Sequence, residues 1–333
     1  MGDAPDEQCE RLTTLLRRHG TGDVTIRRIT ALSGGAASLT FAVDAVRDGC
    51  AWPLIFQRTA AAEVAAGSMP KTIQARLQTR ARDAGLPVAE VIAIASPEDG
   101  LGDGFVMARI DGESLAPRWL RSPDYAEARA ALTGQCAATL AKLHAIPVYD
   151  LADLPLARSS PAEARAAMYD LYRSFGIDVP AFDLAFAWLA ERLPADAPSV
   201  LVHGDFRSGN FIVGPDGLRA VLDWELAHVG HPMADIGWLC TNTWRFGEWR
   251  RPVGGFGDRD AFFDAYAAAG GRVDRGLAAA FELWGSLRWG VMCLQMAQAH
   301  LDGSRRSVEL AAIGRRVSET EIDILHILKH GEV

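Results

Sequence analysis

The most informative stretch of the sequence is His203-Gly204-Asp205-Phe206-Arg207-Ser208-Gly209-Asn210, together with Asp223-Trp224-Glu225, which begins thirteen residues after Asn210. Short apolar runs on either side predict that both stretches lie in turns between strands. Taken singly, the two aspartates and the asparagine are ordinary turn formers. Together they supply a carboxylate that can accept the proton of an attacking hydroxyl, and an amide and a second carboxylate that can hold Mg²⁺ against nucleotide phosphates. The spacing therefore predicts a phosphoryl-transfer site.

Two residues close to this set are expected to be structural. His203 comes two residues before Asp205, where a side chain more often braces the loop backbone than touches a substrate. Asp235, in His231-Pro232-Met233-Ala234-Asp235, begins a predicted helix, and we expect its carboxylate to bond to loop backbone. Neither residue is assigned to the chemistry.

Composition bounds the class of protein. The 333 residues are 49% hydrophobic and 23% charged, a balance typical of a folded globular chain. There are 34 Lys and Arg against 42 Asp and Glu, a net charge of −8. Because such a chain has no overall positive field with which to hold a nucleic-acid backbone, we expect no nucleic-acid partner.

The cysteines and the N-terminus bear on the compartment. The five cysteines are scattered with no Cys-x-x-Cys pair, so we expect reduced thiols and neither a disulfide framework nor a zinc site. The acidic N-terminus lacks the pattern of a signal peptide, and no run of 18 apolar residues occurs. We therefore expect a cytoplasmic protein with no membrane partner. The sequence leaves the oligomeric state open.

The first 110 residues have the pattern of strands with one or two helices. The Gly-rich turn Ser33-Gly34-Gly35-Ala36-Ala37-Ser38 joins the first two strands, and Asp48-Gly49 makes the next turn. A helix with apolar spacing through Ile73 and Leu77 ends at Gly85. The predicted strands are Val24 to Ala31, Leu39 to Val46, Trp52 to Phe56, Val91 to Ala95 and Phe105 to Ile110.

The remainder of the chain is mostly helical, with one interruption. Three short apolar strands are predicted at Val200 to Val202, Phe211 to Val213 and Leu218 to Leu222, around the proposed site. The predicted helices are Tyr125 to His144, Pro161 to Phe175, Phe182 to Leu193, one resuming at Met233, about Asp274 to Leu301, and Ser307 to Leu328.

The order of base, metal ligand and metal ligand matches the protein-kinase catalytic loop, with His-Gly-Asp in place of His-Arg-Asp. On this motif the chain resembles the aminoglycoside phosphotransferase and choline kinase superfamily of small-molecule kinases. The segments Leu283 to Gly290 and Ser307 to Arg316 resemble the branch related to the phosphotransferase domains associated with acyl-CoA dehydrogenases. The resemblance implies an α+β, protein-kinase-like two-lobe fold. Residues 1–110 would form a small antiparallel-sheet lobe that binds the nucleotide, and residues 111–333 a helical lobe with the catalytic loop and the acceptor pocket.

The resemblance also implies roles for particular residues. Asp205 would be the catalytic base, and Asn210 and Asp223 the Mg²⁺ ligands. The Gly-rich turn would cover the phosphates of ATP or GTP through Ser33, Gly34, Gly35 and Ser38. The hinge would meet the adenine edge through the backbone of Ala108 and Ile110, with Met107 lining the pocket.

The first lobe departs from the family pattern. Kinases hold the α and β phosphates with a cation on the third strand, locked by a glutamate on the following helix, and this chain has no lysine before Lys71. The alignment puts Gln57 at the cation position, Arg58 one residue beyond, and Gln74 at the glutamate position. Because a strand alternates faces, Gln57 and Arg58 cannot both point at the nucleotide unless the strand bulges. Either Arg58 serves after a register shift, which we favour, or a Gln57–Gln74 pair replaces the ion pair.

That departure leaves one rival function open, a nucleotide-binding regulator or degenerate kinase with little turnover. A further rival is a plain helical interaction module. The module would leave the spacing of Asp205, Asn210 and Asp223 unexplained. The complete set argues for an active kinase.

The acceptor is expected to be a small-molecule alcohol. Aminoglycosides are polycations and require a carboxylate-lined cleft, whereas Trp244 to Arg251 mixes aromatic and cationic residues. This favours a neutral or anionic acceptor, and the branch resemblance suggests an alcohol of the hydroxyacyl-CoA kind. An aminoglycoside kinase remains the alternative. The tryptophans could equally pack the helical core.

Overall fold

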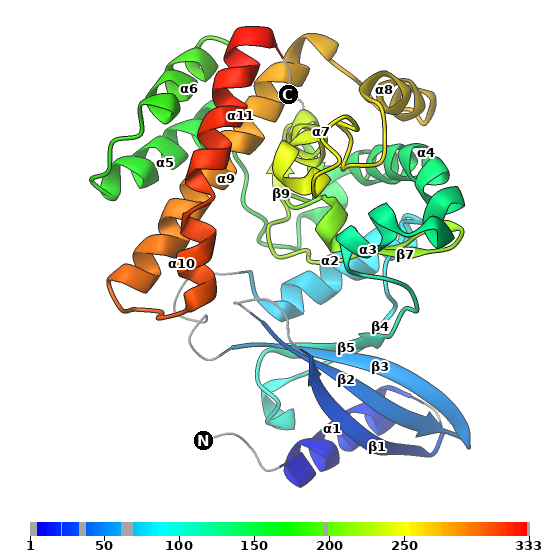
Figure 1. Cartoon of the computed structure of the whole chain (residues 1–333). Coiled ribbons are helices and arrows are strands. Elements are labelled where there is room, and N and C mark those ends of the chain that lie inside the picture. The colour runs from blue at the N-terminus through cyan, green and yellow to red at the C-terminus, as the bar shows by residue number, and fades with distance from the viewer. Residues whose placement is uncertain (1–4, 21, 33–37, 61–68, 196–198, 332–333) are drawn as a thin grey trace. The chain divides into compact units, whose positions relative to one another are not determined.

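The computed structural model describes residues 5–20, 22–32, 38–60, 69–195 and 199–331. The chain divides into two compact units (Figure 1). Unit 1 consists of Met1–Gly112, Asp153–Pro155 and Leu222–Leu226, and unit 2 of Glu113–Ala152, Leu156–Val221 and Ala227–Val333. Within the described ranges, no helix has the length and apolar character needed to cross a membrane.

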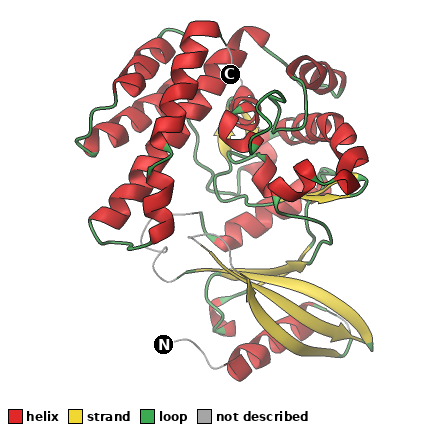
Figure 2. Cartoon of the chain, viewed as in Figure 1, coloured by secondary structure: helices red, strands yellow, loops and turns green. Residues whose placement is uncertain are grey.

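Unit 1 is built on an antiparallel sheet, whose strands are drawn in yellow in Figure 2. The sheet has five strands in the order β1-β2-β3-β5-β4, and each neighbouring pair is antiparallel. The predicted α+β class, with a small antiparallel sheet followed by a helical part, is confirmed. The elements of this unit are α1 (Pro5–His19), β1 (Val24–Leu32), β2 (Ser38–Arg47), β3 (Cys50–Thr59), α2 (Lys71–Asp83), β4 (Val91–Ile94), η2 (Pro97–Asp99) and β5 (Gly104–Ala108).

A two-residue turn fixes the register of β2 and β3. Asp48 and Gly49 both have positive φ, 52° and 80°, as a hairpin of this length prefers. Pairing then runs without a shift from Arg47↔Cys50 to Ser38↔Thr59. The register places Gln57 opposite Thr40 and Arg58 opposite Leu39.

Two hydrophobic clusters cover different faces of the sheet, because side chains alternate along each strand. On β3, Leu54 and Phe56 pack in the cluster that contains Leu12, Leu15 and Leu16 of α1. Ile55 packs instead against the cluster of Ala75, Ala89, Phe105 and Met107, in which Ala75 belongs to α2. The two helices therefore bury opposite faces of β3.

Unit 2 is mainly helical and holds two small antiparallel sheets, β6 with β9 and β7 with β8. Its helices are α3 (Ala116–Arg121), α4 (Ala126–His144), α5 (Pro161–Ser174), α6 (Pro180–Ala190), α7 (Met233–Cys240), α8 (Arg259–Ala268), α9 (Ala278–Leu301), α10 (Val308–Gly314) and α11 (Val317–His330). Its strands are β6 (Val200–Val202), β7 (Phe211–Gly214), β8 (Gly217–Val221) and β9 (His228–Gly230). The strand β9 was not predicted.

The prediction of one final helix from Ser307 to Leu328 is wrong, because the helix is interrupted between α10 and α11. Arg315 and Arg316 donate to carbonyls three residues back, which tightens the last turn of α10. A Cβ on Gly314 would lie 2.5 Å from Cβ of Ala297 on α9. The glycine therefore lets α10 pack closely on α9 (Figure 1), at some cost in helix propensity.

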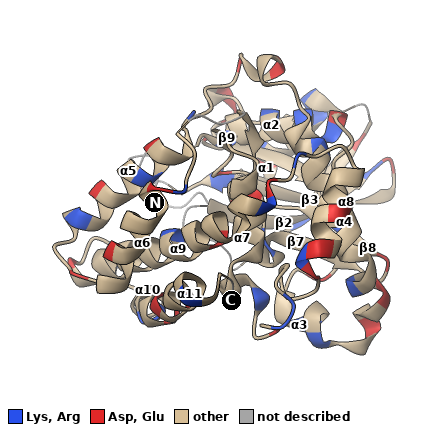
Figure 3. Cartoon of the chain, turned by 90° about the horizontal axis from the view of Figure 1, so that it is seen from above, with Lys and Arg blue, Asp and Glu red and all other residues tan. Residues whose placement is uncertain are grey.

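Close packing of α7 on α9 fixes the core of unit 2. A Cβ on Gly237 would come within 2.4 Å of the backbone of Phe281. The next residue, Trp238, is 2% exposed and belongs to a cluster with Trp244 and Trp289. The surface of the unit is different: charges of both signs are interleaved on outer helices such as α5 (Figure 3), as is typical of a solvated face.

A buried ionic triad joins three elements of unit 2. Glu282 on α9 lies 2.6 Å from Nη2 of Arg245, at the end of η6 (Asn242–Arg245), and 2.6 Å from Nη2 of Arg259 on α8. The side chain of Glu282 is 3% exposed and that of Arg245 is fully buried. Burial lowers the pKa of Arg245, and Glu282 opposes that effect by favouring the guanidinium.

Glu282→Ala is expected to lower the free energy of unfolding by about 3–5 kcal/mol, because it leaves a buried guanidinium without its carboxylate. Glu191→Ala is the matched control, since the side chain of Glu191 is 78% exposed beside Arg192. The effect of Glu191→Ala on the free energy of unfolding should be too small to measure readily. Denaturant unfolding followed by circular dichroism would compare the two, and equal midpoints would contradict the triad's role.

Candidate active site

The loop that follows β6 is held by a buried carboxylate. Asp235, fully buried on α7, accepts hydrogen bonds from the backbone N–H groups of His203 (2.8 Å) and Gly204 (2.9 Å). His203 in turn accepts from the N–H of Asp205 at Nδ1 (3.2 Å). The expectations that Asp235 bonds to loop backbone and that His203 braces the loop are confirmed.

Asp235 is itself anchored from behind. Its Oδ2 lies 3.1 Å from Nε2 of His144 on α4, and Nδ1 of His144 lies 2.7 Å from the hydroxyl of Tyr266 on α8. Burial by itself raises the pKa of Asp235, but the hydrogen bond with His144 and the nearby His203 outweigh it and hold the pKa below its usual range. The loop therefore rests on an ionised carboxylate fixed by two helices.

The carboxylate of Asp205 is surrounded by donors, and its side chain is 10% exposed. Its Oδ1 accepts from Nε of Arg207 (2.9 Å) and from Nε1 of Trp238 (2.7 Å), and its Oδ2 accepts from Nδ2 of Asn210 (2.6 Å). All of these residues belong to unit 2. Two of the three predicted catalytic and metal residues, Asp205 and Asn210, are thus in direct contact.

The amide of Asn210 has a defined orientation. Its Nδ2 donates to the main-chain oxygen of Asp205 (3.0 Å) as well as to the carboxylate. The donor end of the amide is used by Asp205, so the oxygen is the end that could meet a cation. An amide oxygen is a ligand of the kind that Mg²⁺ takes.

Asp223 follows the β7–β8 hairpin and belongs to unit 1. Asn210 immediately precedes β7, Asp223 comes two residues after β8, and the pairing Phe211↔Val221 joins the two strand ends from which they extend. Asp223 has a φ of 65°, a left-handed conformation uncommon for a residue other than glycine. Residues in such conformations are enriched at functional sites, and they also occur in tight turns such as that at Asp48.

The predicted nucleotide residues fall into two groups. Ser33, Gly34 and Gly35 lie outside the described residues, whereas Ser38 begins β2. In the hinge, Met107 is 6% exposed and Ile110 packs against the same cluster. The N–H of Ala108 donates to the carbonyl of Glu90 (2.8 Å). Met107 and Ile110 therefore share one apolar surface, as residues lining an adenine pocket would.

The two candidates for the missing cation lie on opposite faces of β3. Because side chains alternate along a strand, Gln57 lies on the same face of β3 as Ile55, which packs with α2. Nε2 of Gln57 lies 3.4 Å from Oγ1 of Thr40. The guanidinium of Arg58 lies 5.8 Å from the ring of Phe41, in the cluster on the α1 side. Among the described residues, buried Nε of Arg58 has no hydrogen-bond partner. The register shows no shift in this stretch.

Sequence reasoning missed residues that the structure brings to the site. Arg207 and Trp238 contact Asp205 directly, and Arg288 on α9 donates to the carbonyl of Gly204 (2.9 Å). In unit 1, Lys71 is buried beside Glu225. Arg207 lies two residues after Asp205, and this spacing in an extended backbone was a usable signal. Nothing in the local sequence pointed to the other residues.

Arginines cover the tryptophan cluster near Asp205. The guanidinium of Arg207 lies 4.4 Å from the ring of Trp244, and that of Arg288 lies 4.5 Å from the ring of Trp238. Trp238 and Trp244 are buried, so they pack the helical core. Two guanidinium groups therefore lie near the Asp205 carboxylate, one over each of two tryptophan rings.

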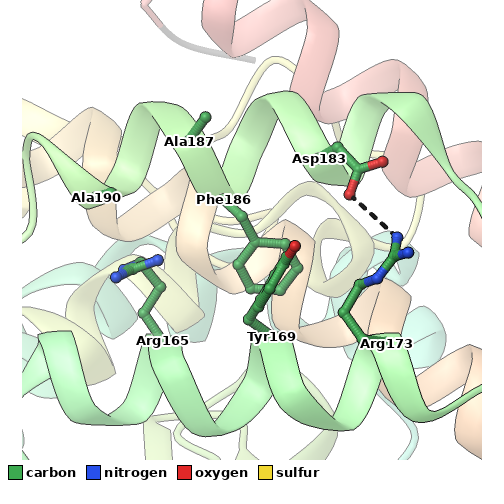
Figure 4. A pocket seen from close by; sticks show the side chains of 7 residues that line it. All are labelled: Arg165, Tyr169, Arg173, Asp183, Phe186, Ala187 and Ala190. Carbon is green, nitrogen blue, oxygen red and sulfur yellow. Dashed lines mark ion pairs between the residues drawn. The ribbon is translucent and has the colours of Figure 1, made fainter.

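A separate hollow of about 490 Å³ lies between α5 and α6 (Figure 4). Arg173 reaches toward Asp183 across it, with 3.9 Å between Nη1 and Oδ1. Its lining is Arg165, Tyr169, Arg173, Asp183, Phe186, Ala187 and Ala190. None of the residues predicted for the site is among them.

Residues 28–277 match the sequence model of the phosphotransferase enzyme family, and the chain belongs to this family. It is 35% identical over 163 residues to acyl-CoA dehydrogenase family member 11 of Gallus gallus, a match that covers 46% of this chain and 20% of the relative. The chain thus spans about a fifth of the length of that relative. The predicted family resemblance is confirmed.

Solved structures give the same fold. A protein of Ralstonia eutropha assigned as an aminoglycoside phosphotransferase has a TM-score of 0.72 at 21% identity, over 94% of this chain and 95% of its own. The ternary complex of APH(2″)-IIa with streptomycin and ATP has a TM-score of 0.61 at 18% identity, over 96% and 97%. The protein-kinase-like fold class is therefore confirmed, and the chain is an enzyme of the phosphotransferase family.

Proposed function

We propose that the protein transfers the γ-phosphoryl group of ATP or GTP to the hydroxyl of a small molecule, with Asp205 as the catalytic base. The observation that carries this proposal is the contact between Oδ2 of Asp205 and Nδ2 of Asn210, in a loop anchored by Asp235. In-line phosphoryl transfer depends on positioning more than on covalent chemistry of the protein. A carboxylate fixed by three donors is suited to orient the hydroxyl and accept its proton.

Asn210 and Asp223 are proposed to hold Mg²⁺. The donor end of the Asn210 amide is occupied by Asp205, and Asp223 adds a carboxylate with a defined backbone conformation. Oxygen ligands of this kind suit a hard cation that shares its coordination with nucleotide phosphates. When bound, the metal would neutralise charge on the phosphate oxygens.

Support for the nucleotide comes from the fold family and from unit 1. The similar structure of APH(2″)-IIa is a complex with ATP. Met107 and Ile110 present apolar surface where the resemblance places adenine. Because the N–H of Ala108 donates to Glu90, the carbonyl of Ala108 and the backbone of Ile110 are proposed to meet the base, and Ser38 to border the phosphate-covering turn.

For the acceptor, we propose a neutral or anionic alcohol, with hydroxyacyl-CoA compounds as the first candidates. The acceptor hydroxyl must approach Asp205, which is flanked by Arg207 and by Arg288. A polycationic aminoglycoside would meet these cations at close range, which is unfavourable. The relative that is named an acyl-CoA dehydrogenase, of which the match covers 20%, belongs to the branch that suggested an acyl-CoA-like acceptor.

The test is a coupled assay of ADP or GDP release with Mg²⁺ and four acceptor classes: hydroxyacyl-CoAs, aminoglycosides, choline-like amino alcohols and aromatic alcohols. Transfer to hydroxyacyl-CoAs, with product phosphate detected by mass spectrometry, is the expected result. Preference for an aminoglycoside would overturn the acceptor assignment. Tight nucleotide binding without transfer to any class would favour the regulator.

A further inference from the structure

Lys71 is an unusual residue in unit 1. It begins α2, and its side chain is 4% exposed, although lysine is almost never fully buried unless it is paired. Its Nζ donates to Oε1 of Gln74 (3.0 Å) and lies 3.9 Å from Oε2 of Glu225. Among the described residues, Gln74 is the one acceptor within hydrogen-bond reach of an ammonium that has three donors. The group can therefore donate to further oxygens.

The surroundings of Lys71 include the proposed metal ligand. Burial lowers the pKa of Lys71, while the charges of Glu225, Asp223 and Asp103 oppose that effect and favour the ammonium. Asp223 and Glu225 belong to the short segment Leu222–Leu226 that packs with unit 1. The ammonium and the Asp223 carboxylate are thus part of one electrostatic group within this unit.

The first turn of α2 holds Lys71 in place. Asp103, which precedes β5, accepts from the backbone N–H groups of Lys71 (2.7 Å) and Thr72 (3.0 Å) and from the hydroxyl of Thr59 at the end of β3 (2.9 Å). Gln74 donates through Nε2 to the carbonyl of Met69 (2.9 Å), which turns its oxygen toward Lys71. The helix start is therefore pinned to the sheet.

Neither Gln57 nor Arg58 of β3 supplies a cation on the face of the sheet that packs against α2. Gln57 lies on the α2 face but is neutral, and Arg58 lies on the α1 face with Phe41. Gln74, at the position of the family's glutamate, bonds instead to Lys71. A neutral glutamine at position 74 is consistent with a phosphate-binding cation on α2 instead of β3. Its amide oxygen can orient the ammonium of Lys71 without neutralising it.

We propose that Lys71 on α2 contacts the phosphate oxygens of the nucleotide, in the place of the cation expected on β3. This inference rests on the proposed function, since it names the nucleotide as ligand. Lys71 donates to the phosphates, Gln74 orients its ammonium, and Asp223 contributes to the metal beside it. Glu225 is the counter-charge near Lys71 when no phosphate is present.

The test compares binding of ATP and adenosine to the purified full chain by calorimetry, with Mg²⁺ throughout. Lys71→Met should weaken ATP binding about 10- to 100-fold, the loss expected for a charge-assisted hydrogen bond, and leave adenosine binding unchanged. Arg58→Met is the matched control and should alter ATP affinity less than about twofold. Adding Gln57→Lys to Lys71→Met returns a cation to the α2 face of β3 and should recover most of the lost affinity.

The outcomes separate this inference from the proposed function. If wild-type protein binds no ATP, the proposed function fails and Lys71 has no nucleotide to hold. If wild type binds ATP and Lys71→Met binds it equally well, or loses adenosine as strongly as ATP, Lys71 is only a structural partner of Glu225. A large loss in Arg58→Met alone would give the role to Arg58. Should Lys71→Met fail to fold by circular dichroism, Lys71→Gln serves the same comparison.

Discussion

Asp205→Asn is expected to lower kcat about 10²- to 10⁴-fold while the affinity for nucleotide stays within about threefold of the wild type. The amide must keep an acceptor toward Arg207 and Trp238, which both donate to Oδ1. Its NH₂ group then faces Nδ2 of Asn210 in the position of Oδ2. Asn210 retains its bond to the main-chain oxygen of residue 205, so the metal ligand should stay near its place.

The matched control for this substitution is Asp216→Asn. Asp216 lies in the turn between β7 and β8 with a side chain 77% exposed, and its change should leave kcat unaltered. Single-turnover rates with saturating nucleotide would isolate the chemical step. Turnover at the wild-type rate in Asp205→Asn would remove Asp205 from the role of base, whatever the nucleotide affinity.

Local spacing made one half of the site predictable. The elements from β6 to β8 are short, and turns between them leave little freedom in where Asp205 and Asn210 can lie. Their contact therefore follows from eight consecutive residues, His203 to Asn210. The bracing role of Asp235 was also expected, although the N–H groups that it binds belong to His203 and Gly204, 32 and 31 residues earlier in the sequence.

The features that could not be predicted depend on contacts between residues that are distant in the sequence. The environment of Lys71 depends on Glu225, which is distant in the sequence, so no local pattern marks it. Alternation on β3 predicted that only one of Gln57 and Arg58 could face α2, but the choice depends on which cluster takes which face. The close contact between Gly314 and Ala297, beside the break before α11, is likewise a tertiary feature that helical periodicity alone does not reveal.

Asp223→Ala is expected to weaken the Mg²⁺-dependent part of nucleotide binding by about 10- to 100-fold or more, since even residues behind a metal ligand commonly have effects of that size. Asn210→Ala should have a smaller effect, because it removes a ligand without removing a formal charge. Titrating Mg²⁺ at fixed ATP for each variant would give the ranking. Asp170→Ala, an exposed change on α5, is the control.

The sign of the effect without metal distinguishes a ligand from a structural residue. Asp223 adds negative charge to the group around Lys71, so its removal should leave metal-free ATP binding equal or tighter. A variant that merely unfolds the site would lose both. Alanine is also strained at a φ of 65°, whereas asparagine tolerates it. Asp223→Asn should therefore fold as the wild type does, fall between wild type and Asp223→Ala in Mg²⁺ dependence, and bind metal-free ATP at least as well. Wild-type Mg²⁺ titration curves for both variants would exclude Asp223 as a ligand.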